Sequence, residues 1–88
     1  MTDSVSIAFP CADYPLKVIA ESAADLETQV LGIVAVHVED FDRDTVSLHP
    51  SREGRYTSVR LSITARSEEQ LKSLHTDLMA HPLVRLVL

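Results

Sequence analysis

The feature that most constrains the fold is the alternation of apolar and polar side chains over residues 56–65, which is strict from Ser58 onward. Successive side chains of a strand point to opposite faces of a sheet, so a two-residue period separates them into two sets. The apolar set comprises Val59, Leu61, Ile63 and Ala65. The polar set comprises Tyr56, Ser58, Arg60, Ser62 and Thr64. Such a strand belongs to a sheet covered on one face only, which predicts a two-layer architecture.

Five further segments complete the order strand, helix, strand, strand, helix, strand. Alternation recurs in residues 14–20 and 45–50, and the short apolar run 83–88 is typical of a final strand. Residues 22–38 and 67–81 carry apolar side chains at helical spacing. This order predicts an α+β fold, a ferredoxin-like βαββαβ two-layer sandwich. Right-handed crossovers would place both helices on one face of a four-stranded antiparallel sheet, with the first and third strands central.

Polar residues mark where the two helices should begin. Ser22 would accept a hydrogen bond from a free backbone amide of the first helix, and Asp25 would lie in its positively polarised first turn. Ser67 and Gln70 fit a capping box, in which the two side chains satisfy backbone amides reciprocally. Gly32 lies in mid-helix, where glycine costs about 1 kcal/mol relative to alanine. We therefore expect a neighbouring backbone to approach Gly32 closely.

The length of the chain, 88 residues, suits one domain, since domains run to about 50–250 residues. Residues 14–88 contain the regular pattern and form that domain, whereas we expect residues 1–13 to be a poorly ordered N-terminal arm. We find no pattern of a signal peptide and no apolar run of the roughly 20 residues that a membrane span needs. Cys11 is the only cysteine, so no disulfide forms within the chain. These features favour the cytoplasm and no membrane contact.

The uncovered sheet face is the first candidate for a binding surface. If the alternation holds in every strand, Lys17, Arg60 and Arg85 point there from the first, third and fourth strands. Around them we expect Thr45, Ser47, His49, Tyr56, Ser58, Ser62 and Thr64, with Ile19 and Val87 as apolar members. Three interpretations stay open for bases in a chain of net charge −5. They hold the carboxylate or phosphate of a small anion, they meet an acidic patch of a partner protein, or they only cover the sheet.

The second candidate is the turn before the third strand. Gly54 permits a positive φ, and Arg52 and Arg55 lie on either side of it. The two arginines either contact an anion or a partner at the end of the sheet, or they are the solubilising ends of an ordinary hairpin turn.

Several chemistries lack the residues that they require. Nucleic-acid binding needs a concentrated positive field and stacking rings, whereas this chain is acidic and offers only Tyr56 for stacking on the open face. The acidic run 39–44 lacks the ligand spacing of a calcium loop, and no pair of the four histidines has zinc-ligand spacing. Cys11 has no neighbouring base to activate it, and neither a nucleophile elbow nor a glycine-rich phosphate loop occurs. We expect no catalytic residue, no metal and no cofactor.

Three segments carry a family resemblance. They are Phe9-Pro10, Arg52-Glu53-Gly54-Arg55-Tyr56-Thr57-Ser58-Val59 and the final Leu83-Val84-Arg85-Leu86-Val87-Leu88. Together they resemble the YbeD-like family of small uncharacterised bacterial proteins, over nearly the whole chain. The resemblance implies a ferredoxin-like fold similar to ACT-type regulatory domains, no assigned activity, and a link to lipoate metabolism. ACT domains commonly have glycine in the loop after the first strand. Residues 20–24 have none, which speaks against amino-acid binding at that position.

These observations favour a non-enzymatic module that acts by binding, either in regulation or in protein interaction. Its expected partner is a protein, and a second copy of the same chain, forming a homodimer, is included among the candidates. The alternative is an ACT-like sensor that binds a small anionic metabolite on the open sheet face or at a dimer interface. The sequence identifies neither the ligand nor the oligomeric state.

Overall fold

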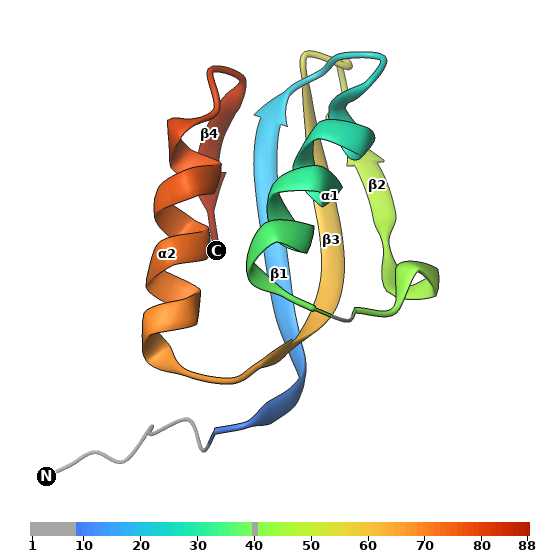
Figure 1. The fold of residues 1–88 in the computed structure, drawn as a ribbon. Helices are drawn as coiled ribbons and strands as arrows, with labels where there is room; N and C mark the ends of the chain where they lie inside the picture. Colours follow the sequence, from blue (N-terminus) through green and yellow to red (C-terminus); the bar gives the residue numbers. More distant parts are fainter. Residues whose placement is uncertain (1–8, 40) are drawn as a thin grey trace, which may run out of the picture.

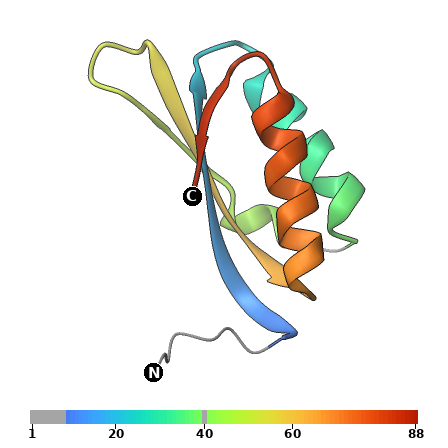
Figure 2. The same cartoon turned by 90° about the vertical axis from the view of Figure 1, so that its left-hand side faces the viewer.

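A computed structural model describes residues 9–39 and 41–88. Its elements are β1 (Cys11–Glu21), α1 (Leu26–His37), η1 (Arg43–Thr45), β2 (Ser47–Pro50), β3 (Tyr56–Ala65), α2 (Glu68–Ala80) and β4 (Val84–Val87). The four strands form one antiparallel sheet in the order β2-β3-β1-β4. Figure 2 shows the sheet edge-on with both helices on the same side. The predicted ferredoxin-like sandwich, with β1 and β3 central, is confirmed.

The core lies between the two helices and the face of the sheet that they cover, as Figure 1 shows. Alternate residues of β1 and β3 supply its sheet side, as the two-residue period predicts. The buried apolar residues of the strands are Leu16, Val18, Ala20, Val59, Leu61, Ile63, Ala65, Val84 and Val87. Those of the helices and the residue that follows α1 are Leu26, Val30, Leu31, Val34, Val38, Leu74 and Leu78. Among the residues described, no buried polar or charged side chain interrupts this core.

The start of α2 confirms the predicted cap. The Ser67 hydroxyl accepts a hydrogen bond from the Gln70 amide at 3.0 Å. The Gln70 side chain reaches back to the amide of Arg66, 2.6 Å from its Oε1, one residue earlier than an ideal capping box. Its Nε2 also donates to the carbonyl of His37 at 2.8 Å. Gln70 therefore fixes the start of α2 and ties it to the end of α1.

The start of α1 differs from the prediction for Ser22. The helix begins at Leu26 with Asp25 as its N-cap, and no side chain caps it. The Ser22 hydroxyl is instead 2.8 Å from Thr57 Oγ1, and its amide donates to the carbonyl of Arg55 at 2.9 Å. Ser22 does not cap α1 because its hydroxyl and its amide are bonded to Thr57 and Arg55. An N-cap must lie directly beside the free amides that it satisfies.

The expectation of a close backbone approach at Gly32 is also wrong. Gly32 is exposed on the outer side of α1, and a Cβ placed there would meet nothing within 4 Å. The helix thus bears the cost of a mid-helix glycine without a packing reason inside the described chain.

The first two strands begin elsewhere than predicted. β1 starts at Cys11, three residues before the expected Tyr14, so residues 11–13 belong to the sheet and not to an arm. Asp13 has a φ of 58° at an irregularity of the β1–β3 pairing, and this break in the alternation hid the start of the strand. Residues 1–8 of the predicted arm lie outside the described residues. β2 starts at Ser47, because Thr45 ends the short η1 helix.

Within residues 9–39 and 41–88, no helix is long and apolar enough to cross a membrane.

Candidate functional site

The open face of the sheet brings Lys17 and Arg60 together. They lie directly opposite each other on the two central strands. Ser47 of β2 lies opposite Arg60 on the other side, so these side chains form one row across the sheet. In the described chain, no carboxylate lies within 4.0 Å of either base. Like charges directly opposite on neighbouring strands are destabilising, so this pair is the feature of the open face that most needs an explanation.

A hollow of about 460 Å³ lies beside this pair. It is lined by Pro15, Leu16, Lys17, Thr45, Arg60, Leu61, Ser62 and Leu88. The Thr45 hydroxyl donates to the carbonyl of Asp42 at 2.7 Å and accepts from the Ser62 amide at 3.1 Å. Thr45 is therefore fixed at the wall of the hollow. Asp42 also accepts from the Asp44 amide at 2.8 Å, which gives this part of the acidic connection a structural role.

Arg85, the third predicted base, lies elsewhere on the sheet. Its guanidinium forms a salt bridge with Glu21 and donates to the carbonyl of Pro82 at 3.0 Å. Glu21 is four residues from Lys17 along β1, which corresponds to about 13 Å at the usual rise of a strand. The structure thus brings two of the three predicted bases together and pairs the third with a carboxylate.

The predicted orientation of Val87 is wrong, and Leu86 takes its place. The β1–β4 pairing shifts register between Ile19 and Ala20, which reverses the phase of the short final strand relative to simple alternation. Val87 is 8% exposed and faces the core. Leu86 is 45% exposed and lies opposite Ile19 on the open face.

The open face consequently carries an apolar row beside the bases. Leu86 lies opposite Ile19, and Leu88, 60% exposed, exchanges two main-chain hydrogen bonds with Lys17 at 3.1 and 2.8 Å. Ser58 lies opposite Ile19 on β3, and Tyr56, 37% exposed, lies opposite Glu21 at the end of the strand. We call Ile19, Leu86 and Leu88 the apolar row, and Lys17 with Arg60 the basic pair.

The part of β1 that extends beyond β4, and so has no neighbour on that side, contains a proline. β1 bonds to β4 and its end through odd-numbered residues, Lys17 with Leu88 and Glu21 with Leu83. Peptide groups alternate in direction along a strand, so the next odd position outside β4, Pro15, faces the free edge of β1. Proline has no N–H to offer a further strand.

The opposite edge is interrupted in the same way. The Ser51 amide donates to the carbonyl of Tyr56 at 2.7 Å, so Ser51, His49 and Ser47 direct their peptide groups to β3. Pro50 therefore faces outward and removes a donor from the outer edge of β2, and Pro15 removes one from the part of β1 that extends beyond β4, which is a common protection against edge-to-edge association. β4 itself is the other edge strand, and its residues 84–87 contain no proline.

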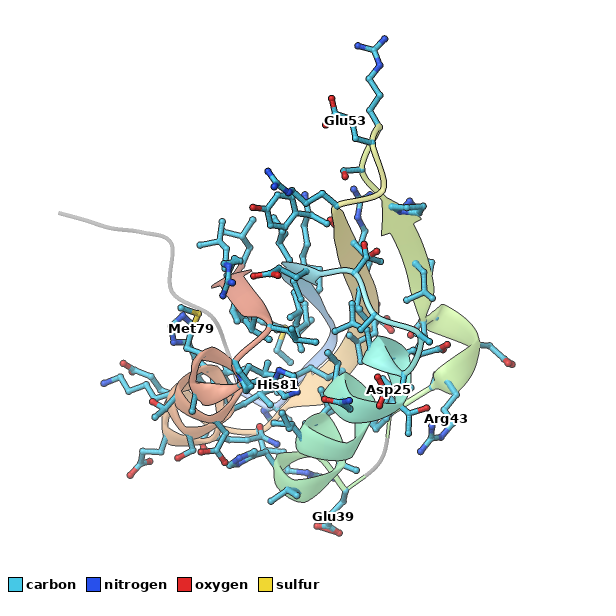
Figure 3. The ribbon with its side chains drawn as sticks, turned by 90° about the horizontal axis from the view of Figure 1, so that it is seen from above. Asp25, Glu39, Arg43, Glu53, Met79 and His81 are labelled. Atoms are coloured by element: carbon cyan, nitrogen blue, oxygen red, sulfur yellow. The ribbon has the colours of Figure 1, made fainter. Side chains whose placement is uncertain are left out.

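The predicted contact turn has the geometry of a hairpin. Gly54 has a φ of 75° and its amide donates to the carbonyl of Ser51 at 2.9 Å, while the Tyr56 amide donates to Ser51 Oγ at 3.2 Å. Figure 3 shows Glu53 at the outer tip, far from the helices. Arg52 and Arg55 lie with Tyr56 around a shallow hollow of about 300 Å³. They are remote from the basic pair and do not join its site.

A groove that the sequence did not reveal lies between α2 and the sheet. It has a volume of about 450 Å³ and is lined by Tyr14, Leu16, Glu68, Leu71, Lys72, Leu74, His75, Thr76, Val87 and Leu88. It exists because β4 is much shorter than β1, so that one end of α2 extends beyond β4. Lys72 at its rim is already paired with Glu68 at 3.3 Å. The signal in the sequence was the shortness of the last apolar run.

Two of the four histidines, His37 and His81, form hydrogen bonds between elements. His37 Nε2 donates to Asp77 Oδ2 of α2 at 2.5 Å. His81 Nδ1 accepts from the Leu83 amide at 3.1 Å, so its Nε2 carries the proton and donates to Gln29 Oε1 at 2.5 Å. Gln29 then donates to Asp25 at 2.5 Å, and Figure 3 labels the two ends of this chain, His81 and Asp25. The described residues contain no group of three or more His, Cys, Asp or Glu side chains placed to hold a metal ion.

The order of the strands and the helical layer define the class of this protein, an α+β sandwich of the ferredoxin-like type with an ACT-like arrangement. Its sequence matches the family described as "Protein of unknown function (DUF493)" over residues 5–88. A UPF0250 protein of Hahella chejuensis is 46% identical over 92 residues, with both chains covered completely. A UPF0250 protein of Azotobacter vinelandii is 42% identical, over 93% of this chain and 89% of the relative. The chain belongs to this family, and the expected YbeD-like resemblance is confirmed.

Solved structures show the same fold at low sequence identity. Protein HP0495 of H. pylori superposes with a TM-score of 0.78 at 14% identity, over 99% of this chain and 90% of that one. The ACT domain from GTP pyrophosphokinase of Chlorobium tepidum superposes with a TM-score of 0.64 at 18% identity, over 88% of this chain and 81% of that one. These likenesses establish the fold, and the site must be argued from this chain's own residues.

Proposed function

We propose that this protein is a small, non-enzymatic regulatory module of the cytoplasm, which acts by binding another protein through its open sheet face. The observation that carries the proposal is the basic pair, Lys17 opposite Arg60 with no carboxylate within 4.0 Å in the described chain. Retaining two facing cations costs stability unless an acid from outside compensates them.

The surroundings of the basic pair suit a protein surface better than a reaction site. The apolar row lies beside the pair and is exposed, as the anchor residues of an interface are before they are covered. The adjoining hollow is shallow, whereas catalysis needs polar groups that converge in a pocket sheltered from water. A link to lipoate metabolism remains an expectation from the family resemblance alone.

Charge reversal of the basic pair tests the proposal. The variant carrying Lys17→Glu and Arg60→Glu should keep its fold, because Lys17 is half-buried and Arg60 exposed, and should lose at least about tenfold in partner capture from a native lysate, as expected for charges at an interface. The matched control carries Arg66→Glu and Lys72→Glu, which change the net charge equally on the helical side of the molecule. Capture that falls equally in both variants, or in neither, would contradict the proposal.

A second candidate function is an ACT-like sensor for a small anionic metabolite. The hollow beside the basic pair favours it, since Lys17, Arg60 and Ser62 line one space and arginine binds carboxylates and phosphates in two-point fashion. Thermal unfolding in the presence of amino acids, lipoyl and octanoyl compounds and phosphorylated metabolites distinguishes the two candidates. A reproducible rise in Tm with one chemical class, lost in the Arg60→Glu variant, would favour the sensor.

A further inference from the structure

The open face can receive a partner from above, without the partner joining an edge strand. This step rests on the proposed function. Pro15 interrupts the free edge of β1, and Pro50 interrupts that of β2. An extended peptide that joined β2, or the part of β1 beyond β4, as an additional strand would find a missing donor there. The open face has neither restriction, because side chains and not peptide groups form its surface.

A second copy of this chain fits the open face poorly. Over residues 15–21, 47–49, 56–62 and 84–88, the only side-chain carboxylate is that of Glu21, and it is bound by Arg85. A two-fold interface repeats the same patch on both subunits. Two such faces would bring two basic pairs close together, and like charges that face each other across an interface are unfavourable. The partner is therefore a different protein that carries acidic groups.

The spacing of the exposed side chains suits a helix lying along the strands. Leu86 and Leu88 are two residues apart on β4, which is about 7 Å. Side chains four residues apart on a helix repeat every about 6 Å. A helix over the apolar row could therefore present one apolar side chain to each leucine. Lys17, which faces Leu88, and Arg60 on the next strand would then lie along one flank of that helix.

We propose that the partner binds through an amphipathic acidic helix. Its apolar stripe packs on Ile19, Leu86 and Leu88, and carboxylates on one flank pair with Lys17 and Arg60. Such a helix would form a third layer on the face opposite α1 and α2. Helices in exposed grooves and on sheet faces are recognised through apolar anchors at three- and four-residue spacing.

A photo-crosslinking side chain in the full-length protein tests this partner class. Benzoylphenylalanine replaces Ser58, which is half-buried beside Ile19 on the open face, or Thr28, which is exposed on α1 as the matched control. Irradiation of the source cells, followed by mass spectrometry, should identify a segment attached to position 58 and not to position 28. That segment should be acidic, with apolar residues at three- and four-residue spacing.

The attached segment is then synthesised and titrated into the unmodified protein. We expect it to gain helical circular dichroism on binding, and its Kd to rise about tenfold or more with Leu86→Ser and with Lys17→Glu plus Arg60→Glu. A segment that is basic or that binds without becoming helical overturns the helix and leaves open-face binding intact. Cross-links between copies of this chain, or none from position 58, overturn both proposals.

Discussion

The effect of a substitution at a single residue depends on the immediate surroundings of that residue, and the two glycines of this protein show how far these surroundings can differ. Gly54 has a φ of 75° in the hairpin turn, a region that side chains with a Cβ rarely adopt. Gly32 lies on the outer side of α1 with open space where a Cβ would be. The same substitution should therefore act with opposite sign at the two positions.

Replacing Gly32 with alanine should raise the free energy of unfolding by about 0.5–1 kcal/mol, because alanine restricts the unfolded chain and suits a helix. Urea unfolding followed by circular dichroism measures the change. Gly54→Ala is the control and should lower stability by about 1 kcal/mol, since it forces a Cβ into the left-handed region. A destabilised Gly32→Ala protein would contradict this account and indicate that something covers α1.

At the scale of elements, the sandwich is fastened by a few side chains that connect one element to the next. Gln70 holds the start of α2 and also donates to the carbonyl of His37 at the end of α1. His37 in turn donates to Asp77 of α2. At the opposite end, His81 and Gln29 link the end of α2 to the start of α1.

Replacing Gln70 with alanine should cost about 1–3 kcal/mol, because the amide of Arg66 and the carbonyl of His37 both lose a partner at a half-buried position. Thermal unfolding of the variant measures this loss. The neighbouring Glu69→Ala, at an exposed position of the same turn, should change stability by less than about 0.5 kcal/mol. Equal effects of the two substitutions would show that the connection between the helices contributes little.

For the molecule as a whole, the two faces of the sheet and its two edges have different roles. One face is covered by α1 and α2, the other presents the basic pair and the apolar row, and proline interrupts the edge at β2 and the part of β1 beyond β4. These features support the proposal that the open face binds another protein.

Restoring donors at β2 and at the part of β1 beyond β4 should make the protein self-associate. The variant with Pro15→Val and Pro50→Val should keep the fold and form dimers or larger species at concentrations where the parent chain does not, because exposed edges template strand pairing. Analytical ultracentrifugation measures this. Ser47→Val is the control, since it adds a β-branched side chain to β2 without adding an outward donor. An unchanged sedimentation profile of the double variant would mean that the prolines do not protect the edges.

Local patterns in the sequence were sufficient to predict the fold, because periodicity and helix caps are properties of residues that are close together in the chain. The alternation of residues 56–65 predicted a sheet covered on one face, and Ser67 predicted the start of α2. The order of the six main segments then left the ferredoxin-like sandwich as the arrangement that connects them.

Only the tertiary structure decided how the site is composed. The register shift opposite Ile19 turned Val87 into the core and Leu86 outward, and neither residue carries a local sign of that shift. Arg85 met Glu21, a residue distant in sequence, and so left the group of free bases. Lys17 and Arg60 are opposed because β1 and β3 pair in one particular register. Periodicity fixes which way a side chain points within its own strand, whereas its neighbours depend on the register between strands, which long-range packing sets.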